Sequence, residues 1–186
     1  MTRLMAVAVC GLWAGVALAD KTPRSPPTPP SPPGKHTSDG GGFTVQFPTR
    51  PTSVEDAKQI ATPAGNQTVT TTKVETGGVV YSVSWTEYPE SFGIVSAKEI
   101  LDGVVGGMKG KDGRVFGFDG KDGTGEDISL DGVTGRRLAV AAGDNLARAK
   151  LYLKERRLYM VLVSGRREAS QGGQADRFLD SFAWAK

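Results

Sequence analysis

Carboxylates are the side chains of this sequence best suited to chemistry, because the usual nucleophiles and metal ligands are almost absent. The 186 residues include one histidine, His36, and one cysteine, Cys10. A Ser-His-Asp or Cys-His site needs a histidine inside the fold, and zinc sites need cysteine or histidine ligands. His36 lies in a Pro- and Gly-rich stretch that we expect to lie outside the folded domain. The composition therefore predicts that the protein is not an enzyme of these classes and holds neither a cofactor nor a metal.

A pair of carboxylates remains chemically permissible, because two Asp or Glu side chains suffice to hydrolyse a glycosidic bond. The candidates are Glu87, Glu90, Asp102 and Asp119. Their positions in the sequence do not pair them, and none of the stretches G-x-S-x-G, S-x-x-K, Walker or G-x-G-x-x-G occurs. A carboxylate-dependent hydrolase acting on envelope or environmental polymers therefore stays as the alternative to a non-catalytic role.

The stretch 109–126 is rich in Gly, Asp and Lys. Together with the residues that follow it, this stretch offers oxygen ligands of the kind that calcium prefers. These ligands are Asp112, Asp119, Asp122, Glu126, Asp127 and Asp131. Their spacing differs from that of an EF-hand loop, and the interleaved Lys111, Arg114 and Lys121 oppose a cation. Because Asp-Gly is common in turns, we favour turns over a cation site here.

Basic and apolar residues alternate in residues 147–154, which predicts a strand with one basic face. That face carries Arg148, Lys150, Tyr152 and Lys154. Acidic residues outnumber basic ones in 43–135, whereas basic residues predominate in 136–168. The face is either the solvated side of a half-buried strand or a surface for an anionic partner, such as an envelope component or an acidic protein.

The first 19 residues have the pattern of a secretory signal peptide. Arg3 precedes an apolar run over 4–18, and Ala17-Leu18-Ala19 fits the small-x-small cleavage rule. Cleavage near Ala19 predicts an extracytoplasmic protein, in the periplasm or secreted, and export argues against a nucleic-acid partner. Because Cys10 lies within the signal, the mature chain is expected to contain no disulfide. No later segment is long and apolar enough to predict a transmembrane anchor.

Residues 20–42 are predicted to form an extended, disordered linker. Seven of the 11 prolines lie between Pro23 and Pro33, and the stretch closes with three consecutive glycines at 40–42. Such a composition favours a polyproline-like spacer that buries nothing. The folded part is therefore predicted as a single domain over 43–186.

Within that domain, period-two alternation and turn residues predict mainly strands. We expect them over 43–47, 58–62, 67–75, 79–86, 127–130, 136–142, 147–153 and 158–164. Apolar spacing predicts a helix from 97 to 108, begun by the capping box Ser96–Glu99, and a shorter helix over 175–182. Because short turns make neighbouring strands antiparallel, the fold class is α+β, with an antiparallel sheet of six to eight strands flanked by helices.

The order of five sequence motifs along this domain resembles a known group. They are FTVQFP, WTEYP, ISLDGVTGRRLAV, RLYMVLV and RFLDSF. Together they resemble small exported bacterial domains of the PsbP-like α/β/α sandwich type, over nearly all of 43–186. The resemblance rests on turns and core residues, so it implies an accessory or binding role and transfers no catalytic residues. The sequence as a whole predicts an exported, non-catalytic binding or accessory module on a Pro-rich linker.

Overall fold

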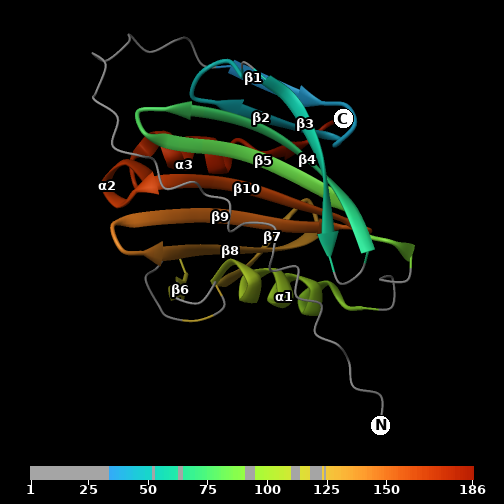
Figure 1. Cartoon of the computed structure of the whole chain (residues 1–186). Helices are drawn as coiled ribbons and strands as arrows, with labels where there is room; N and C mark the ends of the chain where they lie inside the picture. The colour runs from blue at the N-terminus through green and yellow to red at the C-terminus, as the bar shows by residue number, and fades with distance from the viewer. Residues whose placement is uncertain are drawn as a thin grey trace.

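The computed structural model describes residues 34–51, 53–62, 65–90, 95–109, 114–117, 123 and 125–186. The predicted signal peptide and residues 20–33 of the predicted linker lie outside this range, as do Asp112, Asp119 and Asp122. The described elements form a large central sheet with a small sheet and two short helices on one face and a longer helix on the other (Figure 1).

The central sheet has eight strands and is antiparallel throughout, which confirms the predicted fold class. Along the sheet the strands are β3 (Ser53–Thr62), β4 (Gly65–Thr76), β5 (Val79–Glu87), β10 (Arg157–Arg166), β9 (Asn145–Lys154), β8 (Val133–Ala142) and β6 (Arg114–Phe116), with β7 (Glu126–Leu130) also paired to β8. The β4–β5 turn shows why neighbours are antiparallel. Gly77 and Gly78 both have positive φ, at 60° and 73°, which is the geometry of a two-residue hairpin.

The small sheet corrects the predicted domain boundary at Gly42. It consists of β1 (Gly34–Ser38), β2 (Phe43–Phe47) and β11 (Ala183–Trp184), so residues 34–42 belong to the fold and not to the linker. The glycines preceding β2 form its turn. The Gly42 N–H donates to the Ser38 carbonyl at 2.8 Å, and the Gly41 N–H donates to Ser38 Oγ at 3.0 Å.

His36 is likewise inside the fold, contrary to the sequence-based prediction. It is 7% exposed and lies between the rings of Phe43 and Phe47, with centroid distances of 6.2 and 6.0 Å. Its Nε2 lies 3.4 Å from Thr72 Oγ1 on the central sheet. Gly34, His36 and Ser38 are buried while Lys35 and Thr37 are exposed, an alternation that the polar composition of the segment conceals.

Two hydrophobic layers lie on either side of the central sheet, and β10 is buried on both faces. One layer is formed with the small sheet and α3 (Gly173–Asp180), through residues such as Phe47, Tyr81 and Phe178.

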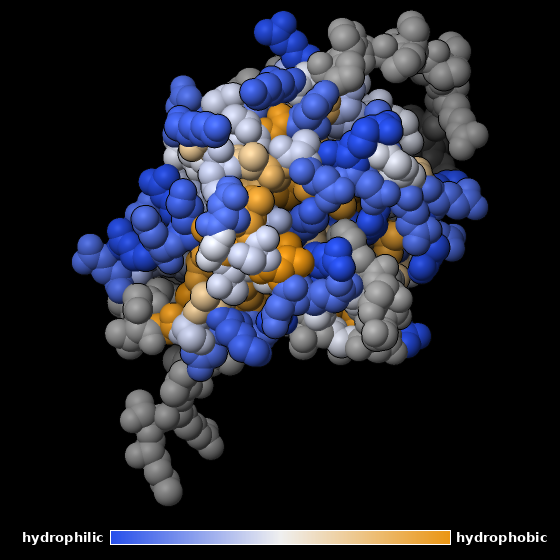
Figure 2. All heavy atoms as spheres, turned by 180° about the vertical axis from the view of Figure 1, so that it is seen from behind, coloured by the Kyte–Doolittle hydropathy of each residue, from blue (hydrophilic) through white to orange (hydrophobic). Residues whose placement is uncertain are grey.

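Viewed from behind, the molecule is mostly covered by hydrophilic side chains, and hydrophobic ones emerge in a patch near the centre (Figure 2).

The second layer lies beneath α1 (Ala97–Lys109), which packs against β8, β9 and β6. The predicted capping box is confirmed: the Glu99 N–H donates to Ser96 Oγ at 3.2 Å, and the Ser96 N–H donates to Glu99 Oε2 at 3.1 Å. The remaining helix, α2 (Arg167–Ser170), leads into α3. Among the described residues, no helix has the length and apolarity needed to cross a bilayer.

Candidate functional site

The four residues of the predicted basic face lie on one side of β9, as their alternation predicts, but α3 packs over that side. Arg148 is 14% exposed, and its Nη1 lies 2.7 Å from Asp176 Oδ1. Lys150 is 15% exposed, and its Nζ lies 2.6 Å from Asp180 Oδ1. These two ion pairs therefore hold α3 against β9 of the central sheet.

The other two members of the face contact aromatic rings of the same layer. Tyr152 is 4% exposed and stacks on Phe182 with 5.6 Å between ring centroids. Burial, with a smaller contribution from the Asp180 charge, raises the pKa of Tyr152 to about 12. Lys154 Nζ lies 4.8 Å from the centroid of the Trp184 ring. The structure thus corrects the prediction of an open basic surface, because its partners come from α3 and β11, remote in sequence.

The fold brings two of the candidate carboxylates, Glu87 and Glu90, to one guanidinium group and leaves Asp102 apart from them. Glu87 Oε1 lies 3.0 Å from Arg156 Nη2, and Glu90 Oε1 lies 3.7 Å from Nη1 of the same guanidinium. Asp102 lies on α1, where its carboxylate contacts Lys98 and Arg136. Asp119 lies outside the described residues. The two glutamates that the fold brings together are therefore held by a cation.

The acidic stretch is described only in part. Glu126 pairs with Arg137, and Asp127 lies 2.9 Å from Arg136 Nε. Asp131 occupies a turn with φ 51°. No cluster of three or more metal-ligating side chains is found in the portions of the chain that are described.

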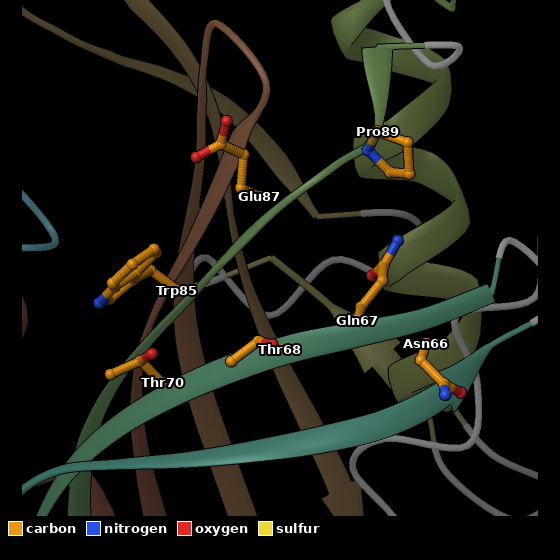
Figure 3. A pocket seen from close by; sticks show the side chains of 7 residues that line it. All are labelled: Asn66, Gln67, Thr68, Thr70, Trp85, Glu87 and Pro89. Atoms are coloured by element: carbon orange, nitrogen blue, oxygen red, sulfur yellow. The ribbon is translucent and has the colours of Figure 1, made fainter.

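A hollow opens where β4 and β5 diverge. The last paired residues of these strands are Val69 and Thr86. Beyond that point Thr86 Oγ1 donates to the Thr68 carbonyl at 2.9 Å, and the two chains separate. The hollow has a volume of about 300 Å³ and is lined by Asn66, Gln67, Thr68, Thr70, Trp85, Glu87 and Pro89 (Figure 3). We call it the splayed-strand pocket.

Two side chains of the splayed-strand pocket have polar atoms without a hydrogen-bond partner in the described protein. Gln67 is only 3% exposed, yet neither its Oε1 nor its Nε2 is paired, and its side chain rises from β4 toward Pro89 in Figure 3. Trp85 Nε1 is also buried and unpaired. Leaving such a group unsatisfied costs about 1–3 kcal/mol, and most native buried polar groups are paired. The pocket is therefore built with hydrogen-bonding capacity that the protein does not use itself.

The rim of the pocket carries a fixed charge network. Arg157 Nε donates to Glu87 Oε2 at 2.9 Å, and Arg156 Nη2 donates to Oε1 of the same carboxylate. The hydrogen bond to Glu87 raises the pKa of Arg157. The Arg157 guanidinium also lies 5.3 Å from the Trp85 ring centroid and donates to the Gly40 carbonyl at 3.1 Å. The turn between β1 and β2 thus helps to hold the indole in place.

A second hollow, of about 240 Å³, lies beside Tyr88. It is lined by Tyr88, Val95, Ala97, Ile100, Leu153, Glu155 and Arg156, so its walls come mainly from the start of α1 and the β9–β10 turn. Burial raises the pKa of Tyr88 to about 12. Four of its seven lining side chains, those of Val95, Ala97, Ile100 and Leu153, are aliphatic and offer no hydrogen bond to a polar ligand.

Sequence analysis identified Glu87 in this region and missed Gln67 and Trp85. Both residues fall in expected strands, over 67–75 and 79–86, to which the sequence assigned no site. The available signal was Gln67 itself, which occupies the same side of β4 as the buried Val69. A glutamine at an inward position of an alternating strand is a polar group that needs a partner.

Comparisons with known proteins give a fold-level likeness only. No family model matches the chain, and no curated protein matches it. Among solved structures, it is similar to cyanobacterial PsbP (CyanoP) from Synechocystis sp. PCC 6803, with 12% sequence identity and a TM-score of 0.46. The alignment covers 82% of this chain and 92% of that one.

Proposed function

We propose that this protein is an exported, non-catalytic binding or accessory module that holds its partner in the splayed-strand pocket. One observation carries the proposal: Gln67 and Trp85 line the same hollow with buried polar atoms that lack a partner in the described protein. Proteins keep such locally unfavourable arrangements mainly at functional sites. A bound ligand would satisfy these groups and offset their cost.

The electrostatics of the site support binding over hydrolysis. A glycosidase-type reaction needs one carboxyl group that gives up a proton and a second that acts as base or nucleophile. Glu87 is held by Arg156 and Arg157, and Glu90 is 92% exposed beside Arg156. Both oxygens of Glu87 already accept hydrogen bonds from these guanidinium groups, so this carboxylate serves as a partner of the arginines.

Export is supported by the sequence alone, through the signal-like residues 1–19 and the Pro-rich run that follows. A Pro-rich segment is a semi-rigid spacer, so the module would be held away from whatever lies at its other end. N-terminal sequencing of the protein from its own host checks this: a chain beginning near Asp20 supports export, and a cytosolic chain that keeps Met1 contradicts it.

The binding role is tested by immobilising the purified protein and passing solubilised cell envelope of its host over it. The wild type is compared with Gln67→Met, which removes the amide at similar volume, and with Gln46→Met, the same change at an exposed position of β2. We expect the wild type and Gln46→Met to retain the same envelope material and Gln67→Met to lose it.

Equal retention by all three proteins would contradict binding through this pocket. Polymer cleavage, followed as new reducing ends, is measured in the same samples. Cleavage that is abolished in Glu87→Gln would instead establish the hydrolase alternative.

A further inference from the structure

The hydrogen-bonding groups of the splayed-strand pocket form a mixed set of donors and acceptors. The Gln67 amide offers both an acceptor and donors, and the Trp85 indole offers a donor only. Thr68 and Thr70 add hydroxyls, and Asn66 adds a second amide at the exposed edge. A ligand that satisfies the Gln67 amide must both donate and accept at closely spaced positions, as adjacent hydroxyl groups do. The Trp85 indole points away from Gln67 (Figure 3) and offers its donor separately.

Among the described residues that line the pocket, Glu87 alone is charged. The guanidinium groups of Arg156 and Arg157 already contact both of its oxygens. An anionic ligand would face the Glu87 carboxylate, and a cationic one would have to displace an arginine. The lining therefore favours a neutral ligand.

The backbone beside the pocket is poorly placed for pairing with a peptide strand. On one side, Gln67 and Thr68 are in register with Ile60 and Gln59 of β3. On the side that faces the gap, the Thr68 carbonyl already accepts the Thr86 hydroxyl. Strand addition depends on free main-chain groups, so recognition here is left to side chains.

We propose that the splayed-strand pocket binds a neutral glycan through the hydroxyl or acetamido groups of one or two sugar units. The inference rests on the proposed function and specifies its ligand. A volume of about 300 Å³ is at the small end of the range for ligand pockets, about 300–1,000 Å³, which suits a short stretch of a glycan chain. Gln67 is the specificity-determining residue, because its unpaired amide oxygen and nitrogen lie next to each other. They can therefore form hydrogen bonds with two neighbouring groups on one edge of a sugar ring.

The test measures binding of defined soluble oligosaccharides to the full protein by titration calorimetry. The neutral probes are tetramers of β-1,4-linked glucose, mannose, xylose and N-acetylglucosamine, and the acidic probe is tetragalacturonate. We expect at least one neutral tetramer to bind and the acidic one not to bind. Gln67→Met should weaken that binding about tenfold or more, as expected from lost hydrogen bonds in a buried setting.

Two controls separate the pocket from general effects. Gln46→Met makes the same substitution at an exposed site, and Trp184→Phe removes the other indole of the described residues, which already donates to the Leu130 carbonyl at 3.3 Å. Both should bind the neutral tetramer as the wild type does, whereas Trp85→Phe should weaken binding.

Three results would overturn the glycan proposal: no neutral tetramer binds, tetragalacturonate binds best, or Gln67→Met binds the neutral tetramer as well as the wild type. The failure of the glycan proposal is distinguishable from failure of the binding role. If envelope material is retained in a Gln67-dependent way while no neutral tetramer binds, the pocket is a binding site and its ligand is of another class.

Discussion

Gln67 and Trp85 occupy positions where the local chemistry opposes stability. Gln67 has two buried amide atoms and Trp85 one buried indole nitrogen that lack partners in the described protein. Each such group costs about 1–3 kcal/mol when unsatisfied. Removing one of these groups should therefore stabilise the free protein, and the free energy of unfolding reports this directly.

Gln67→Met is expected to raise the free energy of unfolding by about 1–2 kcal/mol, because it replaces an unpaired amide with an apolar group of similar size. Urea denaturation measures the change, with Gln46→Met as the control that should lie within about 0.5 kcal/mol of the wild type. A loss of more than about 1 kcal/mol in Gln67→Met would show that the amide has a partner in the free protein.

Trp85 and Trp184 form a matched pair for the same question. Both are half-buried and lie beside a cationic side chain, but only the Trp184 indole has a carbonyl partner. Substitution by Phe removes the same volume from each, so the difference between the two variants isolates the N–H. We expect the free energy of unfolding of Trp184→Phe to be about 1 kcal/mol lower than that of Trp85→Phe. The reverse order would contradict the claim that the Trp85 indole N–H is unpaired.

At the scale of elements, α3 is held on the central sheet by ion pairs as well as by its apolar face. Arg148 and Lys150 each contact an aspartate of α3, whereas Lys154 contacts the Trp184 ring. The double variant Arg148→Glu/Lys150→Glu places like charges together, and we expect it to lose about 1–3 kcal/mol of stability. Lys154→Glu should lose less than half as much; equal losses in chemical denaturation would contradict this account of how α3 docks.

All four tyrosines of the chain have raised pKa values, chiefly because of burial, and those of Tyr88 and Tyr152 reach about 12. In the unfolded chain a tyrosine titrates near 10. The folded state therefore retains phenolic protons that the unfolded state loses, so the stabilisation is complete below pH 10 and is lost as the pH rises toward 12. Denaturation at pH 9, 10 and 11 should show a progressive fall above 10, and stability that stays flat to pH 12 would contradict the burial of these phenols.

At the scale of the whole molecule, the strands and the fold class could be predicted because alternation and turn residues are local signals. The β5 strand and the capping box of α1 are examples, and both are present as predicted. The start of the fold could not be predicted, because Gly34–Ser38 shares its composition with the linker and is stabilised by distant partners such as Phe47 and Thr72. The candidate site could not be predicted either, because it depends on where β4 and β5 diverge, and no local sequence pattern indicates that point.

The corrected boundary makes a prediction about truncation. A chain that begins at Gly34 should be more stable than one that begins at Gly42, because only the longer one keeps β1 and the buried His36. Loss of an edge strand with an inward-facing ring should lower the free energy of unfolding by about 3 kcal/mol. Thermal melts of the two fragments measure this, and equal melting temperatures would place β1 outside the cooperative fold.

The central claim is that the unpaired groups of the splayed-strand pocket exist to bind a ligand, and ligand-linked stabilisation tests it most directly. A ligand that binds only the folded state raises the melting temperature in proportion to its affinity and concentration. Envelope material that the immobilised wild type retains is eluted and added back to free wild type, Gln67→Met and Gln46→Met. We expect it to raise the melting temperature of the wild type and of Gln46→Met and to leave that of Gln67→Met unchanged, whereas an equal rise in all three would contradict the assignment of the binding site.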